Sequence, residues 1–157
     1  MNIPQRLQAL LRELGQRMGL SQLSFDTDGG CALELDQRMI ISLQYHEANN
    51  ELWLYTDLGP ILQRSLALCE KLLQANLFWQ QTSGATLSLS GDEPPHAVLA
   101  RALHWMPMDE TGVVAAVENF VNTVEGWQDQ LKQTETEVKK VNLPMAQAME
   151  MLLRSRA

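Results

Sequence analysis

The fold of this chain is decided by the stretch from Ala75 to Leu131, which reads ANLFWQQTSGATLSLSGDEPPHAVLARALHWMPMDETGVVAAVENFVNTVEGWQDQL. Apolar and polar residues alternate in 84–90 and again in 97–105, with a turn-rich loop between them. This alternation predicts two strands joined as a hairpin. Asp109 is a good N-cap for the amphipathic helix that closes the stretch. The stretch predicts a helix end, a hairpin and a closing helix, and it contains no cluster of catalytic residue types.

The first half of the chain shows the same two periods. Between Pro4 and Gly19, leucines recur at helical spacing and predict an amphipathic helix. Period-two alternation then predicts four strands that pair as antiparallel neighbours, at residues 22–26, 31–36, 39–45 and 52–56. A second helix is expected from Pro60 to about Asn76. Because apolar residues cover nearly its whole circumference, we expect it to be buried on two sides, one of them against another subunit.

The order of these elements predicts an α+β domain, an antiparallel sheet with helices packed on it. A length of 157 residues fits one domain, which we place at residues 1–131. The composition changes after Leu131, so residues 132–157 are expected to form a polar linker and a short C-terminal helix or flexible tail. Self-docking, partner contact and disorder of this last segment all stay open.

Composition argues against several classes of partner. The net charge is −7, with only 12 Lys and Arg, whereas a phosphate backbone requires clustered cations. No apolar run approaches the ~20 residues of a membrane span, and the N-terminal residues lack the apolar block of a signal peptide. We therefore expect a cytoplasmic (bacterial) protein that binds neither nucleic acid nor membrane.

Motifs for catalysis, cofactors and metals are not found in the sequence. His46, His96 and His104 stand apart from any Cys, Asp or Glu at metal-ligand spacing. Neither a phosphate loop nor a serine nucleophile elbow occurs. Cys31 and Cys69 lie in apolar segments and are interpreted as small core residues, with a reactive thiol as the alternative. We expect a non-enzyme without catalytic residues, metal or cofactor.

Several short segments occur in a characteristic order. They are Met18-Gly19-Leu20 before a Leu-Ser-Phe sequence, Ile40-Ile41-Ser42-Leu43 after an Asp-rich hairpin, the helix end from Leu72 to Phe78, Gly84-Ala85-Thr86-Leu87 at a strand start, and Phe120-Val121 with Trp127 in the last helix. In this order, from about Leu7 to Leu131, the chain resembles the class I chaperones of type III secretion, the CesT or Tir-chaperone family.

The resemblance implies an α-β-β-β-α-β-β-α fold and a cytosolic homodimer. Such a chaperone binds the N-terminal segment of one or more secreted effector proteins in extended form and keeps them competent for secretion; the secretion ATPase is a further implied partner. The resemblance suggests effector contact on the first helix and nearby strands, at Leu7, Leu11, Leu14, Phe25, Leu33 and Trp53. The alternative is that these residues fill the core. It suggests a dimer interface at Ile61, Leu62, Leu66, Cys69, Leu73, Leu87 and Leu89.

Three other functions stay open at this point. A partner-switching regulator could use the same fold to sequester a regulatory protein. A stand-alone domain of similar topology, such as the YbjN-like proteins, would have no connection with secretion. A small-molecule enzyme would require a deep polar pocket that holds a perturbed carboxylate.

Overall fold

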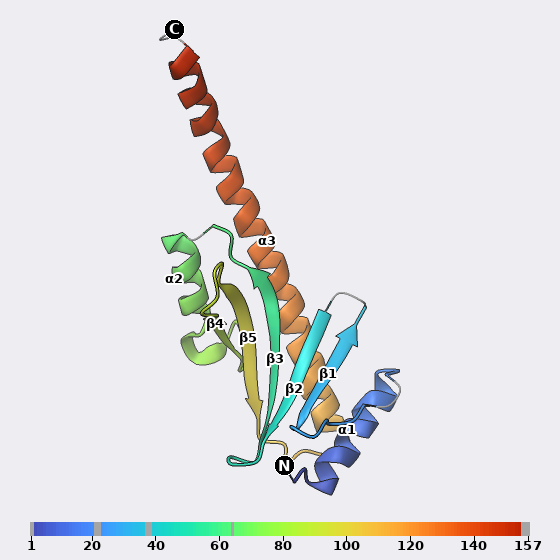
Figure 1. Ribbon diagram of the computed structural model, residues 1–157. Coiled ribbons are helices and arrows are strands. Elements are labelled where there is room, and N and C mark those ends of the chain that lie inside the picture. The colour runs from blue at the N-terminus through green and yellow to red at the C-terminus, as the bar shows by residue number, and fades with distance from the viewer. Residues whose placement is uncertain (1, 21–22, 37–38, 64, 155–157) are drawn as a thin grey trace.

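The structure, a computed structural model, describes residues 2–20, 23–36, 39–63 and 65–154, the last twenty of these by their backbone (Figure 1). Its elements, in chain order, are α1 (Gln5–Arg17), β1 (Gly30–Leu35), β2 (Met39–His46), β3 (Glu51–Pro60), α2 (Leu66–Ala75), a short 3-10 helix η1 (Leu77–Trp79), β4 (Thr86–Leu89), β5 (His96–Leu103) and α3 (Glu110–Arg154). The predicted α+β fold with its α-β-β-β-α-β-β-α order is confirmed. No helix in the described ranges combines the length and apolarity needed to cross a membrane.

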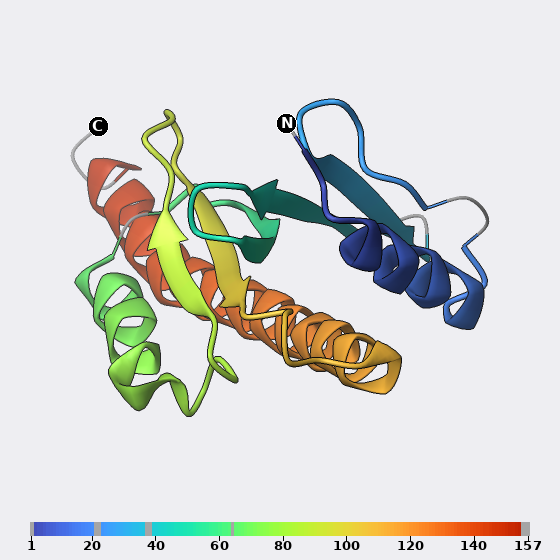
Figure 2. The same cartoon turned by 90° about the horizontal axis from the view of Figure 1, so that it is seen from below.

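The five strands form one antiparallel sheet in the order β1-β2-β3-β5-β4. Helix α3 runs along one face of this sheet and contacts β3, and α1 lies against α3 (Figure 1). Helix α2 lies at the other end of the sheet, beside β4 (Figure 2). Alternate strand residues such as Tyr55 and Ser88 point away from α3 and are exposed.

The core lies between the sheet and the helices. Alternate strand residues such as Leu33, Ile41 and Leu99 are fully buried there, as expected for strands with one apolar face. On α3, Val117 and Phe120 are buried at helical spacing. The apolar periodicities read from the sequence therefore correspond to the faces that meet in this core.

The strand predicted at residues 22–26 is wrong. Residues 23–26 have no regular structure, and residues 21 and 22 lie outside the described part of the chain. Asp26 is the reason, because its carboxylate accepts the backbone N–H groups of Asp28 and Gly30 at 2.9 and 2.8 Å. This side-chain turn competes with strand pairing and reverses the chain before β1 begins.

The second helix starts later than predicted. β3 continues through Pro60 and pairs with β5 up to His96, with an irregularity between Asp57 and Gly59. Gly59 has a φ of +114°, which a residue without Cβ adopts readily. Helix α2 begins only at Leu66, after the Ser65 hydroxyl accepts the N–H of Leu68. The glycine and proline thus end a strand here instead of starting a helix.

Helix α3 is longer than predicted. It begins as expected after Asp109, whose carboxylate accepts the N–H of Gly112 at 2.8 Å. It then continues to Arg154 through residues 132–140, where a linker was expected. These residues contain neither glycine nor proline and are rich in Lys, Glu and Gln, which are good helix formers. The end of α3 projects beyond the sheet (Figure 1).

Candidate functional site

The two edge strands of the sheet differ in how their outer backbone groups are satisfied. On β4, the side-chain amide of Asn76 donates to the Leu87 carbonyl at 3.0 Å and accepts the Leu87 N–H at 2.8 Å. The amide thus takes the place of a neighbouring strand at the middle of β4. The chain itself therefore closes this edge at Leu87.

The other edge, on β1, is open. Gly30 uses its N–H and its carbonyl for Asp26, so these groups of Gly30 point away from β2. Alternate residues of an antiparallel strand turn their backbone to the same side, and Ala32 and Glu34 therefore present theirs outward. Within the described residues neither makes a hydrogen bond outside the sheet. We call the outward backbone of Ala32 and Glu34 the open β1 edge.

A groove lies near the start of β1, between the end of α1 and the segment that follows it. It has a volume of about 580 Å³, and its apolar lining includes Leu20 and Leu23. Ser24, which also lines it, donates its N–H to the Cys31 thiol. The groove therefore lies close to β1. A peptide strand that paired with the open β1 edge could place its apolar side chains in it.

The six predicted effector-contact residues do not form one surface. Leu7, Leu11, Leu14 and Leu33 are buried in the core of the chain. Phe25 is half-buried near the start of β1. Trp53 is half-buried on the sheet face opposite α3, and its Nε1 donates to Glu51 at 3.3 Å. Of the six, only Phe25 and Trp53 offer surface that a partner could contact in this conformation.

The predicted dimer-interface residues divide between the core and the surface. Ile61 and Leu87 are buried, and Cys69 is half-buried. Leu62, Leu66 and Leu73 are 67–75% exposed, and Leu89 is 42% exposed. Helix α2 is therefore apolar on its core side, where Leu68 and Leu72 are buried, and again on its exposed side.

Three further exposed residues in η1 extend this apolar surface, and sequence reasoning assigned them no role. Leu77, Phe78 and Trp79 are all more than half exposed. Phe78 and Trp79 have φ values of +53° and +52°, which are unfavourable for bulky residues. The loop is held in place, since Trp79 Nε1 donates to the Thr86 hydroxyl at 3.2 Å. The sequence did contain a signal for this exposed surface, a run of three large apolar residues just before a polar loop.

We call these exposed residues together the α2 apolar surface. Its members are Leu62, Leu66, Leu73, Leu77, Phe78, Trp79 and Leu89. So many large exposed apolar side chains on and around one helix are uncommon on a protein that works alone, and such residues usually mark an interface.

The titratable groups of the described residues do not assemble into a metal centre. No group of three or more His, Cys, Asp or Glu side chains there is suited to hold a metal ion. Burial raises the pKa of the Cys31 thiol, with a further increase from Asp26 that the Ser24 N–H opposes. A thiol with a raised pKa stays protonated near neutral pH and is a poor nucleophile. This favours the interpretation of Cys31 as a packing residue.

Residues 9–128 match the sequence profile of the Tir chaperone protein (CesT) family. A comparison with curated proteins gave no match.

Solved structures share the fold. The crystal structure of the ExsC–ExsE complex is similar with a TM-score of 0.72 and 21% identity, over 83% of this chain and 97% of that chain. The HopA1–SchA chaperone–effector complex gives a TM-score of 0.67 and 17% identity, over 82% and 99% of the two chains. The Yersinia pestis type III secretion chaperone SycH, in complex with a stable fragment of YscM2, gives 0.62 and 20%, over 76% and 97%. At these identities the similarity establishes the fold.

Proposed function

The chain belongs to the Tir chaperone protein (CesT) family, and on that premise we propose that it binds the N-terminal segment of a type III secretion effector in extended form. We call the bound effector the client. Holding the client segment extended would keep it ready for export. The chaperone needs no chemistry of its own for this task, only a surface that an extended chain can cover.

The observation that carries this proposal is the open β1 edge. An extended peptide can add to a sheet edge through main-chain hydrogen bonds, with its side chains in neighbouring pockets. Ala32 and Glu34 offer the hydrogen-bonding groups, and the groove lined by Leu20 and Leu23 offers apolar contact. The opposite edge is unsuitable because Asn76 already occupies Leu87. The asymmetry supports a single strand-addition site on each protomer.

We further propose that the chain works as a homodimer through the α2 apolar surface. Its members come from the segment before α2, from α2 itself, and from η1 and β4. Burying such side chains against a second copy removes them from water, which contributes about 25 cal/mol per Å² of apolar area. The two proposed roles are then separate in space: self-association at the β4 end of the sheet, and client binding at the β1 end.

Affinity capture from the native bacterium under secreting conditions tests the function. We expect recovery of an exported protein, and light proteolysis should leave a protected fragment near its N-terminus. A Glu34→Pro variant serves as the matched control and should lose this protein. Recovery of only a cytosolic regulatory protein would favour a partner-switching regulator. A protected fragment that is a folded domain would contradict binding in extended form.

A further inference from the structure

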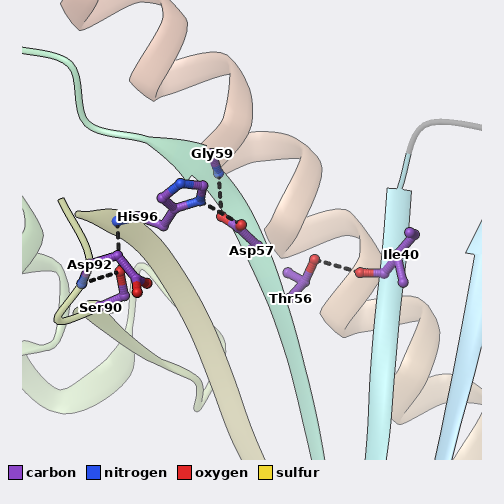
Figure 3. A network of polar contacts seen from close by, with 7 residues as sticks. All are labelled: Ile40, Thr56, Asp57, Gly59, Ser90, Asp92 and His96. Atoms are coloured by element: carbon purple, nitrogen blue, oxygen red, sulfur yellow. Dashed lines mark hydrogen bonds and ion pairs between the residues drawn. The ribbon is translucent and has the colours of Figure 1, made fainter. Parts of the chain in front are cut away.

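The sheet branches where β2 and β3 separate. Their antiparallel register ends at Ser42 opposite Tyr55, whereas β3 continues along β5. In this register Ile41 would come next, opposite Thr56, and Ile40 opposite Asp57 would be the next pair able to exchange backbone hydrogen bonds. The Ile40 carbonyl instead accepts the Thr56 hydroxyl at 2.7 Å, as Figure 3 shows. The branch leaves Ile40 and Asp57 without the pairing that another step of the ladder would give them.

A groove of about 670 Å³ lies over this branch. Its volume falls in the range of about 300–1,000 Å³ that is usual for binding sites. The apolar part of its lining includes Ile40, Tyr55 and Val98, which alternate with core residues and so point away from α3. Ile40 is 59% exposed and Tyr55 is 40% exposed. The groove therefore has an apolar floor that is open to solvent.

The rim of the groove is a fixed polar network (Figure 3). The Asp57 carboxylate accepts the Gly59 N–H at 2.8 Å, and its other oxygen lies 2.6 Å from His96 Nδ1. The Ser90 hydroxyl accepts the N–H groups of His96 and Asp92 at 2.9 and 3.4 Å. Despite these contacts the Asp57 side chain stays 57% exposed. Within the described part of the chain, the Asp57 carboxylate therefore contacts a histidine but no Lys or Arg.

The charge of the groove favours a cationic occupant. The described residues of its lining include the carboxylates of Asp57 and Asp92 and the imidazole of His96, and no Lys or Arg is among them. The whole chain carries a net charge of −7, which adds to the negative potential at this site. An apolar floor beneath two carboxylates is complementary to a segment whose apolar side chains adjoin cationic ones.

We propose that this groove binds a second, short extended segment of the client in which apolar residues stand next to lysine or arginine. The inference rests on the proposed function, because the segment belongs to the client chain. Its apolar side chains contact Ile40 and Tyr55, and its cations pair with Asp57 and Asp92. Its backbone reaches the ladder positions of Ile40 and Asp57 other than the Ile40 carbonyl, which already accepts the Thr56 hydroxyl.

A peptide titration of the full chain tests this proposal without any client. The probe is a blocked six-residue peptide with two central leucines between lysines, and the matched peptides carry glutamates for the lysines or serines for the leucines. Amide NMR signals of Ile40, Tyr55 and Val98 should shift with the lysine–leucine peptide only. Asp57→Asn and Asp92→Asn should each weaken its binding roughly threefold, as for an exposed ion pair, and Ile40→Thr should weaken it further.

Glu118→Gln is the matched control, since it removes one negative charge from an exposed position of α3 and should leave binding unchanged. Equal binding of the glutamate peptide, or equal weakening by Glu118→Gln, would overturn the proposal. Shifts confined to the open β1 edge or the α2 apolar surface would overturn it as well. Failure here is distinguishable from failure of the proposed function, because a chain that still captures its client would lose only the groove assignment.

Discussion

At the scale of single residues, the open β1 edge is defined by the outward-facing backbone N–H groups of Ala32 and Glu34. Gly30 shows which side of β1 faces outward, because both its N–H and its carbonyl bind Asp26. Ala32 and Glu34 follow at the period of two. Leu33 between them turns its backbone to β2 and its side chain into the core.

Glu34→Pro should therefore abolish client binding and leave the protein folded. Proline removes one N–H that faces outward, which an edge strand tolerates, so we expect unfolding free energy to fall by no more than ~1 kcal/mol. Leu33→Pro is the control, since it removes a donor of the β1–β2 ladder together with a buried side chain, and it should unfold the chain. Thermal unfolding and binding of the captured client segment measure both effects. A Glu34→Pro variant that unfolds would contradict the assignment of the open edge.

At the scale of elements, α2 has two apolar sides with different roles. Leu72 is 5% exposed and packs in the core, whereas Leu73 is 72% exposed. Neighbouring residues on a helix point about 100° apart, so one of two adjacent leucines can face the core while the other faces solvent. Phe78 and Trp79, which have positive φ values, are also exposed, so the exposed apolar side of α2 extends into η1.

Leu73→Asp should dissociate the proposed dimer without unfolding the protomer. A charge at the centre of an apolar interface should raise the dimer dissociation constant at least about thirtyfold, the factor for ~2 kcal/mol. Leu66→Asp should act in the same direction. Leu72→Asp is the matched control and should unfold the chain, because it buries a charge in the core. Sedimentation equilibrium with far-UV circular dichroism separates the outcomes; an unperturbed dimer in both surface variants would disprove this interface.

At the scale of the whole molecule, we propose that the end of α3 can be removed without loss of the domain. Among the side chains that the structure describes, Leu131 is the last that is buried. The family match ends at residue 128, while α3 continues to Arg154. The proposed boundary near Leu131 therefore divides a packed domain from a projecting helix.

A chain that ends at Thr134 should keep its fold and its proposed dimer. Because the removed residues lie past the last described core contact, we expect unfolding free energy to change by less than ~1 kcal/mol. Urea unfolding of the shortened and full chains measures this, with a chain that ends at Glu125 as the control, since it also loses the buried Trp127 and Leu131. A large loss of stability from the shorter deletion would place the boundary further along α3.

Much of the fold could be predicted because local periodicity carries it. The leucines of α1, the alternation in β2 and the N-cap at Asp109 each act within a few residues. The misassigned segments are those where a local signal had two meanings. Gly59 and Pro60 suit a strand end as well as a helix start, and Leu23 and Phe25 alternate inside a turn that Asp26 imposes.

The sequence by itself determined the kinds of element, their order and the unusual apolarity of the second helix, since these depend on neighbours along the chain. Only the tertiary structure decided which apolar residues are core and which are surface. Leu7, Leu11, Leu14 and Leu33 were candidates for partner contact and are buried, whereas Leu73 and Phe78 are exposed. It also decided which sheet edge is open. The physical reason is distance along the chain. Periodicity shows that an element has an apolar side. Which segment packs against that side, or pairs with a sheet edge, depends on contacts between remote segments, such as that of Asn76 with Leu87.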